Sequence, residues 1–224
     1  MTKRKKKKFN FKRIFSLIIF IIIVIISCKY ILNIRTKNII ILNNNYYSDE
    51  YIIEESNIQD YPKFLLLNTS KIRNKLLKND LIEDVKITKK WGSILEINIK
   101  EKKVLYYVRS NGKYVTSDGN SYKLDKIDGI PTLINYVTTD VEKEFIKKFA
   151  KLDSSVISLI SEIEYNPNEY DQKRFRLYMN DGNMVYITIP RMDLLSKYVS
   201  IVKQLDNKNG ILYLDSGNYF KIEE

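Results

Sequence analysis

The side chains that usually carry enzymatic chemistry are scarce in this chain of 224 residues. It contains no histidine and a single cysteine, Cys28. Without histidine the chain lacks the commonest general base, the commonest zinc ligand, and every pairing of serine or cysteine with an imidazole. The sequence therefore predicts a binding protein with no metal site, no cofactor and no catalytic residues.

Two carboxylates remain as candidates for acid-base chemistry. Glu162 and Glu164 are separated by one residue, and an enzyme that used them would need a pocket in which both have shifted pKa values. The chain lacks the set of motifs that accompanies a Ser-x-x-Lys nucleophile, and it lacks a glycine-rich phosphate loop and an acidic metal-binding loop. A membrane-anchored enzyme is therefore kept only as an alternative hypothesis.

A block of positive charge precedes one long apolar segment. Residues 1–13 include eight basic and no acidic side chains, and residues 14–32 are almost entirely Ile, Leu, Phe and Val. A helix rises about 1.5 Å per residue, so this segment covers roughly 29 Å, which matches the hydrocarbon core of a bilayer. The pattern predicts a transmembrane helix anchored by residues such as Ile14, Ile22, Ile26 and Leu32. Basic flanks stay in the cytoplasm, so the C-terminal body faces outward.

Two other interpretations of this segment remain open. A basic region followed by a short apolar core is also typical of a cleaved signal peptide. In addition, Ile25-Ile26-Ser27-Cys28 resembles a bacterial lipoprotein cleavage box, which would make Cys28 a lipidated N-terminus. In each case the body lies outside the cytoplasm.

The distribution of charge argues against binding to nucleic acid. The net charge is +11, but residues after 13 carry 30 basic side chains against 27 acidic ones. A body that is so nearly balanced has an ordinary solvated surface rather than a phosphate-binding face. The tail is expected to contact anionic lipid, at about 1 kcal/mol per basic residue near the surface.

Turn chemistry and hydrophobic periodicity divide the body near Lys100–Val104. The first part is predicted to contain a strand, two helices and two strands, at 37–42, 49–56, 70–79, 84–88 and 95–100. Ser48 and Asn68-Thr69 are predicted to cap the helices. Trp91, in the turn Trp91-Gly92-Ser93, is interpreted either as a strand end or as a binding anchor.

The second part, which begins at about Val104, is predicted to be rich in strands. Asn111-Gly112 is the strongest short signal for a hairpin. Strands are expected at 104–109, 113–117, 121–124, 161–165, 174–179, 184–189, 211–214 and 218–222, and helices at 140–152, 155–160 and 190–207. Gly210 is expected to end the last helix, whose predicted buried stripe consists of Leu194, Leu195, Tyr198, Val199, Val202 and Leu205.

The order and spacing of these segments resemble the FtsQ/DivIB cell division family, over nearly the whole chain. The residues that carry the resemblance are 39–45, 64–68, 81–87, 94–101, 114–119, 130–133 and 210–220. The resemblance implies an α+β fold with one N-terminal transmembrane helix. A small POTRA-like β-α-α-β-β domain at 36–102 follows it, and then a mixed α/β "β-domain" at 103–224 with an antiparallel sheet.

The resemblance also implies a function. The family is expected to be a non-enzymatic scaffold at the division septum, which binds FtsL-like and FtsB/DivIC-like single-span proteins and so controls the septal peptidoglycan synthase. The implied mechanism is addition of a partner strand to an exposed sheet edge. The alternative is an envelope lipoprotein with a binding role. The candidate partner-binding residues are Ile211, Tyr213, Leu214, Tyr219 and Phe220.

Overall fold

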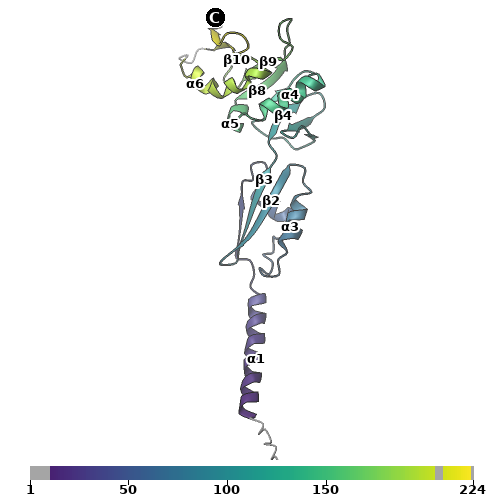
Figure 1. The fold of residues 1–224 in the computed structure, drawn as a ribbon, viewed down its shortest axis with the longest axis vertical. Helices are drawn as coiled ribbons and strands as arrows, with labels where there is room; N and C mark the ends of the chain where they lie inside the picture. The colour runs from purple at the N-terminus through teal and green to yellow at the C-terminus, as the bar shows by residue number, and fades with distance from the viewer. Residues whose placement is uncertain (1–10, 205–208, 223–224) are drawn as a thin grey trace, which may run out of the picture. The chain divides into compact units, whose positions relative to one another are not determined.

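The computed structural model describes residues 11–204 and 209–222, and the chain divides into two compact units, Met1–Glu101 and Lys102–Glu224 (Figure 1). Helix α1 (Phe11–Leu32) belongs to the first unit, and every one of its residues is exposed. Within the described part of the chain it is the one helix that is long and apolar enough to cross a membrane.

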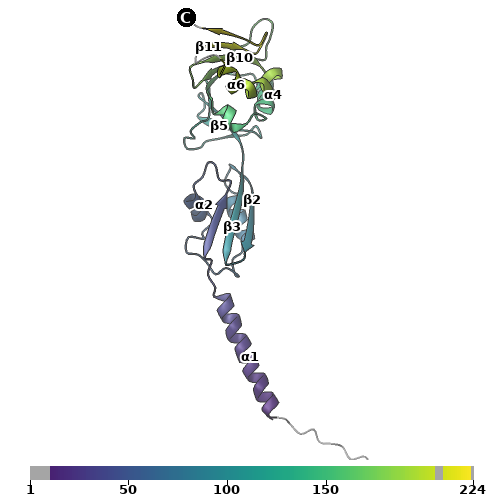
Figure 2. The same ribbon diagram turned by 90° about the vertical axis from the view of Figure 1, so that its left-hand side faces the viewer.

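The rest of the first unit is a three-stranded sheet covered by two short helices. Strand β1 (Asn38–Leu42) runs parallel to β3 (Ile94–Glu101), and β2 (Ile82–Lys90) runs antiparallel to β3, which gives the order β1-β3-β2 (Figure 2). Helices α2 (Asp49–Glu55) and α3 (Thr69–Leu76) bury Ile52, Ile72 and Leu76 against the sheet. The β-α-α-β-β order expected from the sequence is confirmed.

Side-chain caps explain where both helices begin. Ser48 accepts a hydrogen bond from the backbone N–H of Tyr51, at 3.2 Å. Asn68 accepts one from the backbone N–H of Lys71, at 3.0 Å. Each cap satisfies a donor that the first helical turn leaves without an intrahelical partner. The predicted caps are therefore confirmed, and α3 starts one residue earlier than expected.

The second unit is built on a nine-stranded sheet with the order β12-β11-β10-β9-β8-β7-β4-β5-β6. Its helices are α4 (Thr139–Phe149), α5 (Ser154–Ile157), the 3-10 helix η1 (Ile189–Lys197) and α6 (Tyr198–Val202). The strands are β4 (Val104–Val108), β5 (Lys113–Thr116), β6 (Ser121–Tyr122), β7 (Thr132–Leu133), β8 (Ile160–Tyr165), β9 (Arg174–Met179), β10 (Met184–Thr188), β11 (Gly210–Tyr213) and β12 (Tyr219–Ile222).

One face of this sheet forms the core. Side chains alternate between the two faces of a strand, and β9 and β10 bury Phe175, Leu177, Val185 and Ile187 on the same side. Residues of α4, α5, η1 and α6 join them in a single apolar cluster. The helices therefore cover this face, and the alternate residues of β8–β12 point to the opposite face, which we call the open face.

The fold class is confirmed, although the large sheet is mixed rather than wholly antiparallel. The strand pairs β10–β11, β4–β7 and β7–β8 are parallel, and the other five pairs are antiparallel. The pairs β7–β8 and β10–β11 are parallel because helices α4 and α5, and then η1 and α6, return the chain before the next strand, and such a crossover permits parallel pairing. The chain reaches β7 from β4 through the antiparallel strands β5 and β6 and the segment that follows them.

The long helix predicted at 190–207 is wrong. The structure has a 3-10 helix over Ile189–Lys197 and a short α-helix over Tyr198–Val202. Ile189, Met192, Leu195 and Tyr198 are the buried residues, and their spacing of three matches the three residues per turn of a 3-10 helix. Leu194 is half-buried, Val199 is 44 % exposed, and Leu205 lies outside the described residues.

Two further boundaries differ from expectation. Gly210 does not end a helix: it is the buried first residue of β11. The second short helix stops at Ile157 because Ile160 already pairs with Met179 as the first residue of β8. In both places, pairing with another strand determines the conformation, although the local sequence favours a helix or a helix end.

Candidate functional site

Strand β12 is the terminal strand of the large sheet. It pairs with β11 on one side, from Gly210 opposite Ile222 to Tyr213 opposite Tyr219. In the part of the chain that the structure describes, no strand pairs with its other side. Half of the main-chain groups of an edge strand point outward and are free to pair with another chain. The candidate site is this edge together with the side chains that flank it.

The five candidate residues occupy three different environments. Ile211 and Tyr213 are half-buried on the open face, and Tyr219, opposite Tyr213, is 50 % exposed. Phe220 lies opposite Leu212 and packs against the core from the edge. Leu214 is buried in the core, and its N–H donates to the carbonyl of Tyr186 at 2.8 Å. The exposed part of the site is therefore Tyr219 and the rim of Phe220.

Three tyrosines form a stacked row across the open face. Tyr186, Tyr213 and Tyr219 are register partners on β10, β11 and β12. The ring centroids of Tyr186 and Tyr213 are 5.3 Å apart, and those of Tyr213 and Tyr219 are 4.6 Å apart with an interplanar angle of 13°. Cross-strand aromatic pairs stabilise a sheet by about 0.2–1 kcal/mol each. The row therefore fixes the side chain of Tyr219 beside the free edge.

Charged side chains continue the row toward the middle of the sheet. Arg176 is the register partner of both Tyr186 and Glu164, and its guanidinium lies 5.0 Å from the ring of Tyr186. Tyr178 donates a hydrogen bond to Glu164 at 2.7 Å and accepts one from Arg176 at 3.2 Å. The bond from Arg176 lowers the pKa of Tyr178, but the bond to Glu164 and burial outweigh it and raise the pKa. The Tyr178 hydroxyl therefore remains a donor.

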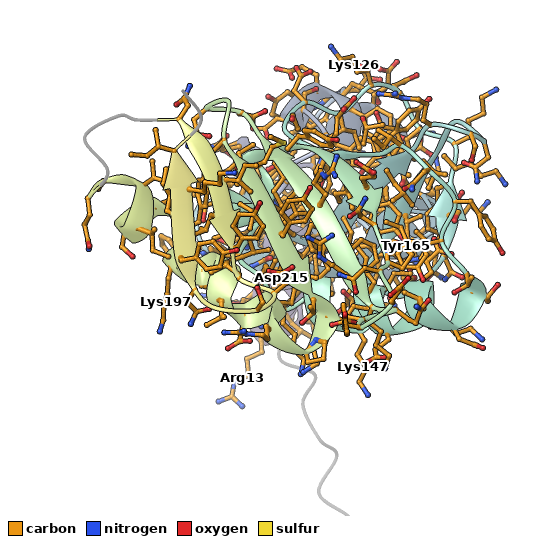
Figure 3. The ribbon with its side chains drawn as sticks, turned by 90° about the horizontal axis from the view of Figure 1, so that it is seen from above. Arg13, Lys126, Lys147, Tyr165, Lys197 and Asp215 are labelled. Carbon is orange, nitrogen blue, oxygen red and sulfur yellow. The ribbon has the colours of Figure 1, made fainter. Side chains whose placement is uncertain are left out.

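An ion pair holds the turn between β11 and β12. Arg174 Nε lies 2.7 Å from Asp215 Oδ2, with both side chains nearly buried, and the same guanidinium lies 3.8 Å from the Tyr186 ring centroid. Arg191 donates to Asn218 Oδ1 at 2.6 Å and to the Asp215 carbonyl at 3.3 Å. Figure 3 labels Asp215 in its place beside the strands of this sheet. Two arginines from other elements thus set the position of β12.

Gly210 has a steric role at this site. A Cβ atom there would lie 2.2 Å from the carbonyl oxygen of Lys221 and 2.9 Å from the Phe220 ring. We expect Gly210→Ala to push β12 away from β11 and to cost about 1–3 kcal/mol of stability, with faster hydrogen exchange at the amides of both strands. Gly217→Ala in the same hairpin is the control, because its Cβ would meet only the Tyr219 side chain, at 3.0 Å. Equal exchange in both variants would contradict this role.

The two carboxylates considered for catalysis are engaged in ion pairs. Glu162 Oε1 lies 2.5 Å from Arg109 Nη2, and Glu164 Oε2 lies 3.5 Å from Arg176 Nη1. Both project from β8 on the open face rather than into a shared cavity. Among the described residues, no three His, Cys, Asp or Glu side chains are grouped so that they could hold a metal ion. The arrangement does not supply the paired carboxylates in a pocket that the enzyme hypothesis requires.

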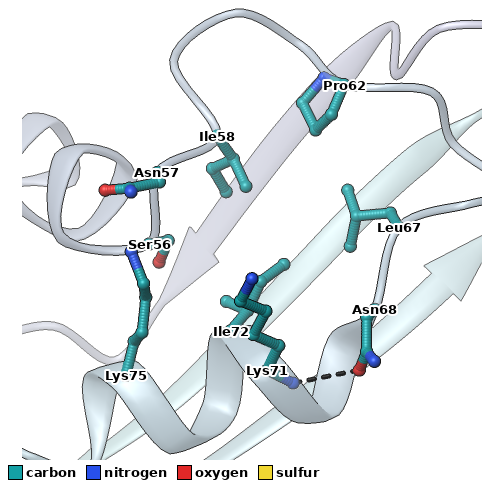
Figure 4. Close-up of a pocket in the computed structure, with 9 residues that line it drawn as sticks. All are labelled: Ser56, Asn57, Ile58, Pro62, Leu67, Asn68, Lys71, Ile72 and Lys75. Carbon is teal, nitrogen blue, oxygen red and sulfur yellow. Dashed lines mark hydrogen bonds between the residues drawn. The ribbon is translucent and has the colours of Figure 1, made fainter.

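A cavity of about 240 Å³ lies between α3 and residues 56–67, which follow α2 in the first unit (Figure 4). Ile58, Leu67 and Ile72 form its apolar lining, and Lys71 and Lys75 lie on its rim. Cavities that hold small-molecule ligands are usually about 300–1,000 Å³. This cavity is smaller, and its lining residues include neither a carboxylate nor a histidine.

Sequence reasoning missed the residues that support the edge. These are Arg174, Arg176, Tyr186, Arg191 and Asp215, none of which belongs to a recognisable motif. A signal was present for three of them, because Arg174 and Arg176 alternate with buried residues on β9, as Tyr186 does on β10. The pairing of Arg174 with Asp215 joins residues 41 positions apart, and no local pattern indicates it.

Two family models match the chain. One is described as "POTRA domain, FtsQ-type" and matches residues 34–102. The other is described as "Cell division protein FtsQ/DivIB, C-terminal" and matches residues 98–216. The second match includes β11 and ends in the turn before β12, so Tyr219 and Phe220 lie beyond it.

Curated relatives match along almost the whole chain. The cell division protein DivIB of Bacillus subtilis is 30 % identical over 227 residues, which cover 97 % of this chain and 86 % of that protein. DivIB of Brevibacillus brevis is 28 % identical, with the same two coverages. DivIB of Listeria monocytogenes is 26 % identical, covering 99 % of this chain and 85 % of that protein.

A solved structure is also similar in sequence. It is the major extracytoplasmic domain of the trans isomer of DivIB from Geobacillus stearothermophilus, with 29 % identity. The match covers 48 % of this chain and 96 % of that domain, with a TM-score of 0.40.

Proposed function

The chain belongs to the FtsQ/DivIB cell division family, and on that premise we propose that it is a non-enzymatic, single-pass scaffold of the divisome. Its body binds an FtsL-like and an FtsB/DivIC-like protein, and through them it influences the septal peptidoglycan synthase. In this role it needs no cofactor and contacts no nucleic acid. The observation that supports the proposal is the free edge of β12 in a chain of this family.

The proposed contact is strand addition to β12. A partner segment in extended conformation pairs its main chain with the outward groups of Tyr219–Ile222, which gives affinity without a deep pocket. Specificity comes from the side chains on either side of the edge. Tyr219 offers an aromatic surface on the open face, and Phe220 offers one on the core face, where it packs against the apolar cluster. Aromatic residues of this kind are enriched at binding hot spots.

The proposed anchor is α1. Residues 1–13 form a cytoplasmic tail, residues 14–32 cross the membrane, and residues 36–102 and 103–224 form two extracytoplasmic domains. The exposure of every residue of α1 is consistent with a helix that contacts lipid rather than protein. Cys28 is exposed in the same helix, and mass analysis of the N-terminus separates this anchor from a lipidated one.

The test of the proposed function is the position of the protein in dividing cells. We expect a fluorescent fusion of the full chain to form a band at midcell, because a divisome scaffold is recruited to the septum. A fusion that carries α1 alone is the control and is expected to be spread over the membrane. An even distribution of the full chain would contradict a role in division.

A further inference from the structure

The first unit gathers exposed apolar and basic side chains at the end of its sheet where the membrane anchor joins. Asn38, at the start of β1, lies opposite Ile94 at the start of β3, and Ile94 lies opposite Lys90 at the end of β2. The turn Trp91–Ser93 is therefore at the same end of the sheet as the linker that follows α1. We call this end of the unit, formed by residues 33–37, 60–66 and 89–93, the basal tip.

Hydrogen bonds fasten the loops of the basal tip to the linker. The N–H of Lys37 donates to the Ser93 carbonyl at 2.8 Å. The N–H of Thr36 donates to the Pro62 carbonyl at 3.0 Å, and the N–H of Phe64 donates to the Ile34 carbonyl at 2.9 Å. Lys89 Nζ donates to the Leu65 carbonyl at 3.2 Å, which ties the end of β2 to the same loop. Hydrogen bonds therefore join all three segments of the tip.

The linker is too short to hold the basal tip far from a bilayer that α1 spans. Arg35 follows Leu32 by three residues, and an extended chain covers at most about 3.6 Å per residue, or about 11 Å in all. The headgroup layer is about 5–8 Å thick on each side of the hydrocarbon core. Because residues 34–37 are bonded to both loops, these loops lie at or near the headgroups.

The side chains of the tip suit that location. Trp91 is 99 % exposed and Leu66 is 62 % exposed, and Tyr61 and Leu65 are also exposed. Tryptophan and tyrosine are enriched at the level of the headgroups, and exposed apolar side chains that gather on one surface mark a site of interaction with a protein or a membrane. The charged residues of the tip are Arg35, Lys37, Lys63, Lys89 and Lys90 against Asp60. Lys90 forms an ion pair with Glu96 of β3.

We propose that the basal tip is a membrane-docking surface, which inserts Trp91 and Leu66 among the lipid headgroups and binds anionic lipid with its lysines and arginine. This proposal rests on the membrane anchor in the proposed function. Docking orients the first unit on the bilayer surface. A basic residue near an anionic surface contributes about 1 kcal/mol, so the tip depends on lipid charge as well as on its apolar side chains.

The chain contains one tryptophan, so its fluorescence reports on the tip directly. The full chain is inserted into vesicles of phosphatidylcholine and phosphatidylglycerol, and the emission of Trp91 is recorded. We expect emission at a shorter wavelength than in water, weak quenching by aqueous acrylamide, and strong loss of intensity when the lipids carry bromine near the glycerol end of the acyl chain. Emission typical of water, with full access to acrylamide, would overturn the proposal.

The matched control is Trp91→Phe combined with Tyr170→Trp. Tyr170 is 95 % exposed in the second unit, so a tryptophan there is equally accessible but is not part of the tip. We expect this variant to emit as in water and to be insensitive to the brominated lipid. Equal quenching at positions 91 and 170 would show that contact is not specific to the tip, and would contradict the proposal.

Lipid charge and the anchor are tested in the same system. Lys37→Glu combined with Lys63→Glu is expected to reduce the quenching of Trp91 by brominated lipid in vesicles that contain phosphatidylglycerol. Unchanged quenching would contradict the proposal that these basic residues bind anionic lipid. Flotation with the vesicles tests the anchor: failure to float would overturn both the anchor and the docking. A floating chain with Trp91 in water overturns the docking alone, and the midcell experiment remains the separate test of the division role.

Discussion

Simultaneous truncation of Tyr219 and Phe220 is expected to abolish most of the capture of the partners. Both rings flank the free edge of β12, on opposite faces, and hot-spot side chains contribute about 2 kcal/mol or more to binding. The loss of one such contact corresponds to about a 30-fold weaker affinity, and Tyr219→Ala with Phe220→Ala removes two. Co-purification of the FtsL-like and FtsB/DivIC-like proteins with the tagged full chain, from detergent-solubilised membranes, measures the effect.

The control must separate binding from folding. Tyr219→Ala alone removes a half-exposed ring and leaves the core packing of Phe220, so this variant should fold normally and still bind less partner. Tyr170→Ala removes an exposed tyrosine elsewhere in the same unit and should leave binding unchanged. Circular dichroism shows whether the double variant is folded. If a folded double variant captured the partners as well as the unmodified chain does, the proposal that partners bind at β12 would be contradicted.

Removal of the Asp215 carboxylate is expected to be the most destabilising change near this edge. The side chains of Arg174 and Asp215 are only 13 % and 11 % exposed, so Asp215→Ala leaves a nearly buried guanidinium without its counter-charge. Such a change costs about 3–5 kcal/mol. For a domain of this size we expect the melting temperature to fall by about 10 °C or more, as followed by circular dichroism. Partner capture should fall as well, because the turn that positions β12 is released.

A double variant tests whether the unpaired charge is the cause. Arg174→Met together with Asp215→Leu removes both charges, and apolar replacement of a buried ion pair is often neutral. We expect it to recover most of the stability lost in Asp215→Ala. Ser216→Ala, an exposed neighbour, should change stability by no more than about 0.5 kcal/mol. If the double variant were as unstable as Asp215→Ala, the loss of stability would come from a change in the shape of the turn rather than from the unpaired charge.

Elements with strong local signals could be predicted from the sequence. The apolar run of α1, the caps Ser48 and Asn68, and the alternation in β9 all depend on residues within a few positions of one another. Local chemistry of this kind is the same in any tertiary context, since a cap satisfies backbone donors of its own helix. The family resemblance depends on the order of such elements, so the sequence alone is sufficient to indicate it.

Elements that depend on distant partners could not be predicted. The apolar residues of 189–202 fit a period of 3.6 as well as a period of three, and packing against the sheet selected the 3-10 form, which buries Ile189, Met192 and Leu195. Gly210 carries the local signal of a helix end, yet pairing with Ile222 of β12 places it in a strand. Propensity is a weak prior, and tertiary contacts override it.

The same division applies to the candidate site. The aromatic residues near the C-terminus could be identified as possible anchors, because tyrosine is enriched at binding hot spots and phenylalanine is enriched in interfaces. Their roles were not visible, since burial is a property of the folded chain: Leu214 enters the core, while Tyr219 joins a row with Tyr186 and Tyr213. The contact between Tyr186 and Tyr213 and the Arg174–Asp215 pair each join segments that are tens of residues apart. Such contacts form only when the sheet register is set, and the register follows from burial of one whole face.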